Sequence, residues 1–244
     1  MTLLNDKVAI VTGGSRGIGR AVAAALVADG ASVAITGTDD ARLNEAHDAL
    51  TASGSGLTDR VMVSRTDVRR EREVDALMTA AVSRFGGVDI LINNAGIGDF
   101  AEVAAMTSDQ WHRVIDTNLT GVFYCSHAAI PHLKARGGGW IINVSSLAGK
   151  NPFVGGAAYC ASKAGLNAFA EALMLEVRHE GIRVSTVMPG SVRTGFSRGG
   201  DAAGMDWKLA PEDVAQVVLD LLHHPSRSLP SRVELRPSRP PRKG

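Results

Sequence analysis

The sequence predicts an α/β fold, a doubly wound parallel sheet of about seven strands with helices on both faces. The main observation is an alternation of short β-branched runs with longer amphipathic segments, the order expected of a parallel sheet. A second observation is that the first run, residues 7–12 (KVAIVT), is almost continuously apolar, which is typical of a strand buried on both faces. The length of 244 residues suits one such domain.

Each further strand is a short run of the same kind, and the amphipathic stretch after it is expected to form a helix. The predicted strands cover residues 7–12, 32–36, 60–65, 88–92, 140–144 and 183–188, with a weaker one at 232–235. The predicted helices lie near residues 18–29, 40–52, 70–85, 108–135, 158–180 and 211–223. We expect residues 1–236 to form a single domain and the basic, proline-rich tail, residues 237–244, to be flexible.

Composition and charge exclude several classes of protein. The chain is 45% hydrophobic and 21% charged, which is ordinary for a globular protein and excludes disorder, collagen and coiled coil. A net charge of +1 attracts neither nucleic acid nor an anionic membrane, although the basic tail leaves a weak nucleic-acid alternative open. No apolar run is long enough to span a membrane. Cys125 and Cys160 form neither a disulfide framework nor a zinc pattern, so we expect a cytoplasmic protein without a metal site.

A glycine-rich turn, residues 13–19 (GGSRGIG), lies between the first predicted strand and the first predicted helix. Glycines let the backbone turn sharply and let a pyrophosphate approach it closely. The helix that follows directs its free N–H groups and the positive end of its dipole at that phosphate. In this strand–turn–helix context the motif predicts a dinucleotide-binding turn.

The glycine spacing resembles that of the classical short-chain dehydrogenase/reductase family, which has a Rossmann-type fold. Further segments match the family in order: Asp67 after the third strand, residues 93–96 (NNAG) after the fourth, and residues 189–190 (PG) with Thr194 after the sixth. The matches extend over residues 7–194, about three quarters of the chain. The resemblance implies an enzyme that interconverts a carbonyl and a secondary alcohol by hydride transfer with a nicotinamide dinucleotide.

Four residues match the family's catalytic set. Tyr159 and Lys163 are four apart, which puts them on one face of a helix. Ser146, rather than its neighbour Ser145, stands 13 residues before Tyr159, and Asn118 stands 28 residues before Ser146. The resemblance makes Tyr159 the acid–base, Ser146 a hydrogen-bond donor to the substrate oxygen and Asn118 the holder of a relay water. Lys163 would hold the cofactor ribose and, as a cation, lower the pKa of the tyrosine from about 10.

The resemblance also favours NADP(H) over NAD(H). An acidic residue at the end of the second strand would repel the 2′-phosphate of NADP, but Gly37 stands there. Arg16 occupies a position where NADP-preferring members often carry a cation. Thr38 and Asp39 count against this preference, although Asp39 reads equally well as a helix N-cap, as does Asp67. The predicted cofactor contacts are Gly13, Ser15, Arg16, Gly17, Ile18, Gly19, Thr38, Asp67, Val68, Asn94, Ala95, Gly96, Tyr159, Lys163, Pro189, Gly190, Val192 and Thr194.

The expected substrate is a small carbonyl compound or alcohol held near Ser146 and Tyr159. In the family a segment after the sixth strand, here about residues 194–209, covers the substrate, and its glycines favour a mobile lid. Phe196, Met205 and Trp207 would line an apolar pocket, with Phe153 and Val154 opposite; packing within the loop is an equal alternative for these side chains.

The same resemblance leaves two alternative functions open and implies that several copies of the chain associate. A β-ketoacyl-thioester reductase is the second reading, which the first half of the chain favours. The ending at residues 229–237 (LPSRVELRP) counts against it, because it departs from the family's common Asp-Gly-Gly ending and resembles that of a subgroup of bacterial-type reductases. A dinucleotide-sensing protein without turnover is the third, and the intact catalytic set counts against it. The two long helices predicted at 108–135 and 158–180 imply a homodimer or homotetramer.

Overall fold

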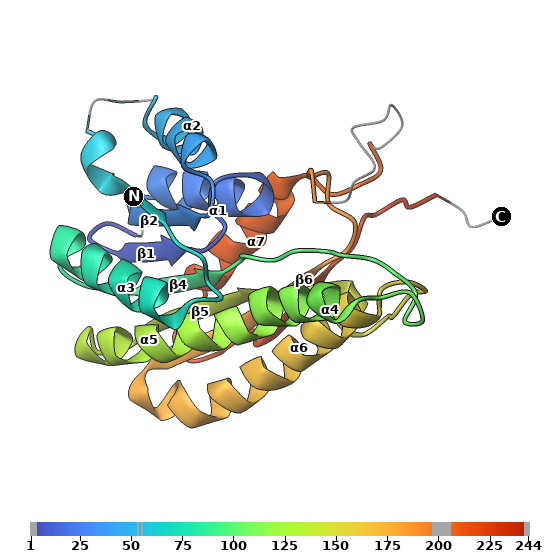
Figure 1. Ribbon diagram of the computed structural model, residues 1–244. Helices are drawn as coiled ribbons and strands as arrows, with labels where there is room; N and C mark the ends of the chain where they lie inside the picture. Colours follow the sequence, from blue (N-terminus) through green and yellow to red (C-terminus); the bar gives the residue numbers. More distant parts are fainter. Residues whose placement is uncertain (1–3, 53, 55, 197–205, 242–244) are drawn as a thin grey trace.

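The structure, a computed structural model, describes residues 4–52, 54, 56–196 and 206–241 (Figure 1). Seven parallel strands form one sheet in the order β3-β2-β1-β4-β5-β6-β7, which confirms the predicted doubly wound fold. The strands are β1 (Val8–Val11), β2 (Ser32–Gly37), β3 (Val61–Arg65), β4 (Ile90–Asn93), β5 (Gly139–Val144), β6 (Ile182–Pro189) and β7 (Arg232–Leu235).

Helices cover both faces of the sheet (Figure 1). One face carries α1 (Gly17–Ala28), α2 (Asp40–Thr51) and α7 (Pro211–Leu222), and the other carries α3 (Glu71–Phe85), α4 (Ser108–Ile115), α5 (Gly121–Ala135) and α6 (Ala157–Val177). Alternate strand residues point to opposite faces. Val11 and Ile35 therefore pack with α1 and α7 in one core layer, whereas Ile10 and Leu91 pack with α3, α5 and α6 in the other.

The predicted helix over residues 108–135 is interrupted by a π-helical turn, η2 (Asp116–Thr120), between α4 and α5. Hydrophobic periodicity does not reveal one extra residue in a turn, so the sequence pattern could not show it. Such turns occur mostly as single insertions in α-helices, often at functional sites. The side chain of Asn118 lies in this turn and is fully buried.

Short 3-10 turns complete the described chain: η1 (Thr58–Arg60), η3 (Leu147–Gly149) and η4 (Arg178–Glu180). The last of these ends the predicted helix over residues 158–180, because Gly181 then adopts a left-handed conformation. No helix in the described ranges is long and apolar enough to cross a membrane.

The sheet order reverses direction between β1 and β4, because β2 and β3 extend to one side and β5, β6 and β7 to the other. At such a point the loops after adjacent strands turn away from each other and leave a crevice at the carboxyl ends of the strands. The glycine-rich turn follows β1 directly, and residues 93–96 follow β4, so the fold brings both predicted motifs to this crevice.

Candidate active site

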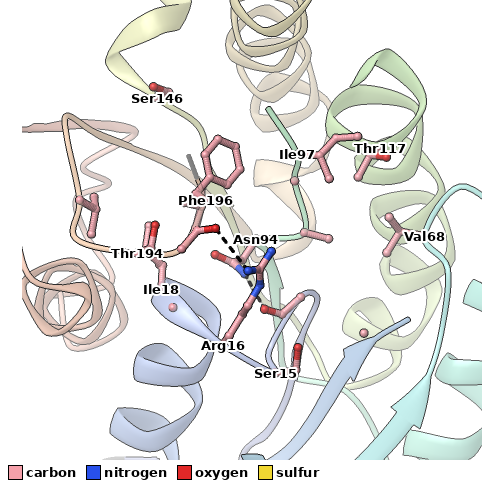
Figure 2. Close-up of a pocket in the computed structure, with 18 of the residues that line it drawn as sticks. Ser15, Arg16, Ile18, Val68, Asn94, Ile97, Thr117, Ser146, Thr194 and Phe196 are labelled. Atoms are coloured by element: carbon pink, nitrogen blue, oxygen red, sulfur yellow. Dashed lines mark hydrogen bonds between the residues drawn. The ribbon is translucent and has the colours of Figure 1, made fainter. Parts of the chain in front are cut away.

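A cavity of about 690 Å³ opens at the carboxyl ends of the strands and contains most of the predicted site residues (Figure 2). The predicted residues that line it are Gly13, Ser15, Arg16, Gly17, Ile18, Thr38, Asp67, Val68, Asn94, Ala95, Gly96, Ser146, Tyr159, Lys163, Pro189, Gly190, Val192, Thr194 and Phe196. Gly19, Asn118 and Phe153 were also expected in the site but do not line the cavity.

The glycines of the turn serve two purposes. Gly13 and Gly17 adopt φ values of +64° and +54°, which side-chain-bearing residues rarely adopt. Gly19 instead allows close packing, since a Cβ there would lie 2.3 Å from the carbonyl oxygen of Gly13 and 2.4 Å from Nδ2 of Asn94. Gly19 therefore shapes the turn from behind, and the first N–H groups of α1 open into the cavity.

Asn94 and Thr12 hold this turn against β4. Nδ2 of Asn94 donates to the carbonyl oxygens of Thr12 and Gly13 at 2.9 and 3.0 Å. The Thr12 hydroxyl in turn accepts from the backbone N–H groups of Asn94 and Ala95, both at 3.0 Å. The turn is thus held in one conformation by the neighbouring strand, which suits a site for a rigid phosphate ligand.

The segment after β6 forms the opposite side of the cavity. Nη1 of Arg16 donates to the carbonyl oxygen of Gly195 at 3.4 Å, and a Cβ on Gly17 would lie 3.2 Å from the Thr194 side chain. Figure 2 shows Arg16 reaching across toward the segment that carries Thr194 and Phe196. The residues present therefore fit a dinucleotide: a glycine cradle without side chains, a helix N-terminus and an elongated cavity.

Two arginines, Arg42 and Arg69, line the end of the cavity that lies next to β2 and β3, and each forms an ion pair with a carboxylate. Asp39 is the N-cap of α2 and accepts from the N–H of Arg42 at 3.1 Å, which confirms the capping alternative for this residue. Asp67 is not a helix cap, because Arg70 occupies that position in α3. Its carboxylate instead accepts from Nε and Nη2 of Arg69, at 2.9 and 2.6 Å, and these hydrogen bonds lower the pKa of Asp67.

Arg42 and Arg69 line the cavity but were not among the predicted residues. Arg42 lies in the first turn of a helix and Arg69 in the loop before the next, where a cation is normally read as solvated surface. Only the pairing of β2 with β3 brings the two loops together at one end of the site. The signal in the sequence that could have identified them is that Arg42 and Arg69 follow the ends of two strands that are neighbours in the sheet, β2 and β3.

Ser146, Tyr159 and Lys163 meet at the other end of the cavity, after β5 and on α6. Lys163 is 4% exposed, and its Nζ donates to the carbonyl oxygen of Val144 at 2.9 Å. The same nitrogen lies 5.9 Å from the ring centroid of Tyr159. Burial lowers the pKa of Lys163 to about 8, because a charged ammonium is disfavoured away from water.

The pKa of Tyr159 is raised, chiefly because burial disfavours the phenolate; hydrogen bonding with Ser146 works in the opposite direction. This corrects the expectation that Lys163 lowers the pKa of the tyrosine. Burial dominates here, and the ammonium is directed at the carbonyl oxygen of Val144. The phenol is therefore protonated at neutral pH, which is the form that can give a proton to a carbonyl oxygen.

Asn118 supports the site from behind the cavity wall. Its Oδ1 accepts from the N–H of Ile97 at 2.8 Å, and its Nδ2 donates to the carbonyl oxygen of Ile97 at 2.9 Å and to Ser162 at 3.0 Å. Ser162 donates onward to the carbonyl oxygen of Tyr159 at 2.7 Å. The side chain of Asn118 thus joins the wall residue Ile97 to the helix that carries Tyr159. Its role in a water relay stays a prediction.

The two adjacent serines after β5 have different surroundings. The hydroxyl of Ser145 is buried and donates to Oδ1 of Asn167 at 2.7 Å. Ser146 accepts from the N–H of Ala148 at 3.1 Å, lines the cavity and hydrogen bonds with Tyr159. The role of Ser146 as the donor to the substrate oxygen stays a prediction.

The substrate side differs in part from the expectation. Phe196 lines the cavity beside Tyr159, with ring centroids 5.7 Å apart. Trp207 instead lines a separate cavity of about 360 Å³ next to residues 237–239 of the tail. Met205 and residues 197–205 of the expected lid lie outside the described residues, as do residues 242–244 of the tail. Among the described residues, no three His, Cys, Asp or Glu side chains are grouped to hold a metal.

Comparison with known proteins agrees with this geometry. The family model "short chain dehydrogenase" matches residues 7–202. An uncharacterised oxidoreductase of Staphylococcus aureus (strain N315) is 34% identical over 97% of this chain and 100% of its own. A metagenomic short-chain oxidoreductase solved in complex with NADP is 35% identical, with a TM-score of 0.84 over 97% of this chain and 99% of its own. An alcohol dehydrogenase of the archaeon Thermococcus sibiricus, complexed with 5-hydroxy-NADP, is 28% identical, with a TM-score of 0.88 over 97% and 99%.

Proposed function

The chain belongs to the short-chain dehydrogenase/reductase family of oxidoreductases, and from this premise we propose that it interconverts a carbonyl and a secondary alcohol with NADP(H). The observation that carries the proposal is one cavity that has a glycine cradle at one end and Ser146, Tyr159 and Lys163 at the other. A protein that only senses a dinucleotide has no need of a half-buried phenol next to a buried ammonium.

The residues of the chain divide the work of carbonyl reduction. A bound nicotinamide supplies the hydride. Tyr159 gives its phenolic proton to the carbonyl oxygen, and the Ser146 hydroxyl donates a hydrogen bond to the same oxygen as negative charge develops there. Lys163, charged below its pKa of about 8, holds the ribose next to the nicotinamide and keeps positive charge near Tyr159. The turn at Gly13 and Gly17 holds the pyrophosphate.

The NADP(H) preference rests on the end of the cavity next to β2. Gly37 has no side chain, so this position has no carboxylate to repel a 2′-phosphate; the nearby carboxylate of Asp39 lines the same cavity and is paired with Arg42. Arg42 is half exposed, and its ion pair with Asp39, at 3.4 Å, contributes little to stability. A phosphate dianion forms stronger, bidentate bonds with a guanidinium, so Arg42 can turn to it. The similar metagenomic oxidoreductase was solved with NADP.

A substitution at Tyr159 tests the mechanism. We expect Tyr159→Phe to lower kcat for NADPH-dependent carbonyl reduction by at least about 100-fold, the loss typical of removing a general acid, while NADPH binding stays within about twofold. The measurement is NADPH consumption at neutral pH with a β-ketoacyl thioester, an α-diketone, an aromatic aldehyde, a cyclic ketone and a keto sugar. Tyr124→Phe is the matched control, since Tyr124 lies on α5 outside the cavity.

The outcomes of this assay separate the alternatives. Retained turnover in Tyr159→Phe would overturn the assigned mechanism. Turnover of the thioester alone would favour the β-ketoacyl-thioester reductase. NADPH binding without turnover of any carbonyl would favour the dinucleotide sensor.

We propose further that residues 1–236 form one domain and that two or four copies associate through α4, α5 and α6. Trp111, Phe123 and Leu175 on these helices are 40%, 45% and 52% exposed. Phe123 of α5 also contacts Phe169 of α6, and an exposed apolar patch across two helices is typical of a surface that another protein covers.

A further inference from the structure

Three phenylalanines from separate segments lie near the reacting end of the cavity, and we call Phe100, Phe153 and Phe196 the aromatic wall. Phe100 and Phe196 line the cavity, and Phe153 packs against Phe100 from outside it. The ring of Phe100 lies 5.7 Å from that of Tyr159 in an edge-on arrangement and 5.6 Å from that of Phe153. Phe196 lies 5.7 Å from Tyr159. Phe100 and Phe196 are 43% and 37% exposed, so each offers part of its ring to a ligand in the cavity, whereas Phe153 is exposed outside it.

Gly98 and Gly156 leave the space that these rings occupy. A Cβ on Gly98 would lie 2.6 Å from Cζ of Phe100 and 2.9 Å from Cε1 of Phe196. A Cβ on Gly156 would lie 2.6 Å from the ring of Phe153. Since real Cβ atoms essentially never come this close, a side chain at either glycine would displace a ring. The rings therefore pack directly on backbone, in defined positions close to Tyr159.

A backbone hydrogen bond joins the two loops that carry the wall. The N–H of Ala101 donates to the carbonyl oxygen of Gly155 at 3.0 Å, which connects the loop after β4 to the loop before α6. Two charged residues close to the wall in the chain have partners, because Asp99 pairs with Arg113 and Lys150 with Glu234. The wall thus presents apolar rings rather than a charge to the substrate.

Resting on the carbonyl chemistry proposed above, we propose that this site selects uncharged aryl ketones and aldehydes, whose ring packs against the aromatic wall. Aromatic rings attract one another in edge-to-face and offset arrangements at centroid separations of about 4.5–7 Å, which are the separations within the wall. A substrate ring beside Phe100 and Phe196 leaves its carbonyl next to Ser146 and Tyr159. Phe100 is then a residue that determines substrate specificity.

The test uses three ketones: acetophenone, cyclohexyl methyl ketone, which has the same number of heavy atoms, and 4-acetylbenzoate, which adds a carboxylate. We expect Phe100→Leu to lower kcat/KM for acetophenone about 3- to 10-fold, the effect of one lost aromatic pair, and to leave cyclohexyl methyl ketone within about twofold. Comparing each ketone between the two proteins removes the differing intrinsic reactivity of the carbonyls. Phe85→Leu, at the end of α3 and outside the cavity, is the matched control.

Gly98→Ala is a second variant that adds volume instead of removing an aromatic ring. Because its Cβ displaces Phe100 and Phe196, we expect it to reduce the preference for acetophenone as Phe100→Leu does. Equal losses for acetophenone and cyclohexyl methyl ketone in both variants would overturn the inference. Better turnover of 4-acetylbenzoate than of acetophenone would also overturn it, and would point to Lys208, which lines the same cavity.

Binding is measured separately by saturation-transfer NMR with acetophenone and cyclohexyl methyl ketone in the presence of NADP. A signal from acetophenone that is stronger than that from the saturated ketone, and that Phe100→Leu weakens, supports the aromatic wall even if neither ketone is reduced. In that case the proposed function fails and the inference stands. Equal binding of the two ketones, or binding of neither, overturns the inference while leaving the Tyr159→Phe test to decide the function.

Discussion

Burial acts in opposite directions on the two titratable groups of the site. It raises the pKa of Tyr159, whose neutral form is the acid, and lowers the pKa of Lys163, whose neutral form is the base. The phenol therefore stays protonated through the neutral range. The ammonium form of Lys163 is present below about pH 8 and is lost above it.

The pH dependence of reduction follows from the raised pKa of Tyr159 and the lowered pKa of Lys163. We expect kcat/KM for NADPH-dependent reduction to stay level from about pH 6 and to fall above about pH 8, where Lys163 loses its charge. Lys163→Arg keeps the charge at every accessible pH, so any remaining activity should decline only at higher pH. Initial rates with saturating NADPH check this, and a profile that rises through pH 8 in the wild-type protein would contradict it.

Arg42 is the residue on which the cofactor preference depends most directly. We expect Arg42→Ala to raise KM for NADPH about tenfold, the worth of one charge-assisted bidentate contact, and to change KM for NADH less than about twofold. Steady-state kinetics with each cofactor make the comparison, and Arg84→Ala, on α3 outside the cavity, controls for loss of a cation. Equal changes for both cofactors would show that Arg42 does not meet the 2′-phosphate.

At the scale of elements, the π-helical turn η2 is what turns the side chain of Asn118 toward the interior. There it bonds both backbone groups of Ile97 and the hydroxyl of Ser162. A residue on the outer face of a regular helix could not make these contacts. The turn thereby couples the loop after β4, the α4–α5 run and the start of α6.

Removing this amide should destabilise the fold. We expect Asn118→Ala to lower the free energy of unfolding by about 2–4 kcal/mol, because buried polar groups of Ile97 and Ser162 lose their partner. Urea denaturation measures the change. Asn151→Ala, at an exposed asparagine, should stay within about 0.5 kcal/mol. If the two variants were equally stable, the coupling through Asn118 would be disproved.

At the scale of the whole molecule, α5 and α6 present an aromatic surface away from the sheet. Phe123 stacks on His127 with ring centroids 5.7 Å apart and meets Phe169 edge-on at 6.4 Å. This surface lies on a different part of α6 from the cavity, so association through it leaves the active site open.

We expect Phe123→Glu to reduce the assembled mass by at least half, since a carboxylate buried between two copies would lack a partner. Analytical ultracentrifugation at fixed protein concentration gives the mass, and Thr79→Glu, on the exposed side of α3, is the matched control. An unchanged mass in Phe123→Glu would exclude this surface as the interface.

How much could be predicted depended on the range of the interactions. The strands, the helices other than the π-helical turn and the glycine turn were predictable, because they follow from periodicity and from backbone conformation that only glycine adopts easily. Ser146, Tyr159 and Lys163 were named from the resemblance to the family, and the structure brings all three to the cavity. Gly19 was predicted to contact the cofactor, but in the structure it allows close packing against Asn94. The sequence could not show this, because that contact arises only when β1 and β4 pair.

By itself, the sequence determined that this chain folds as a doubly wound sheet with a glycine-rich turn after the first strand and a Tyr159–Lys163 pair on one helix face. Only the tertiary structure decided which distant residues join them: Arg42 and Arg69 at one end of the cavity, Phe100 at the other. It also decided the direction of the tyrosine pKa, which depends on exclusion of water rather than on sequence neighbours. The physical reason is that patterning is local, whereas burial and contact between loops exist only after the strands have paired.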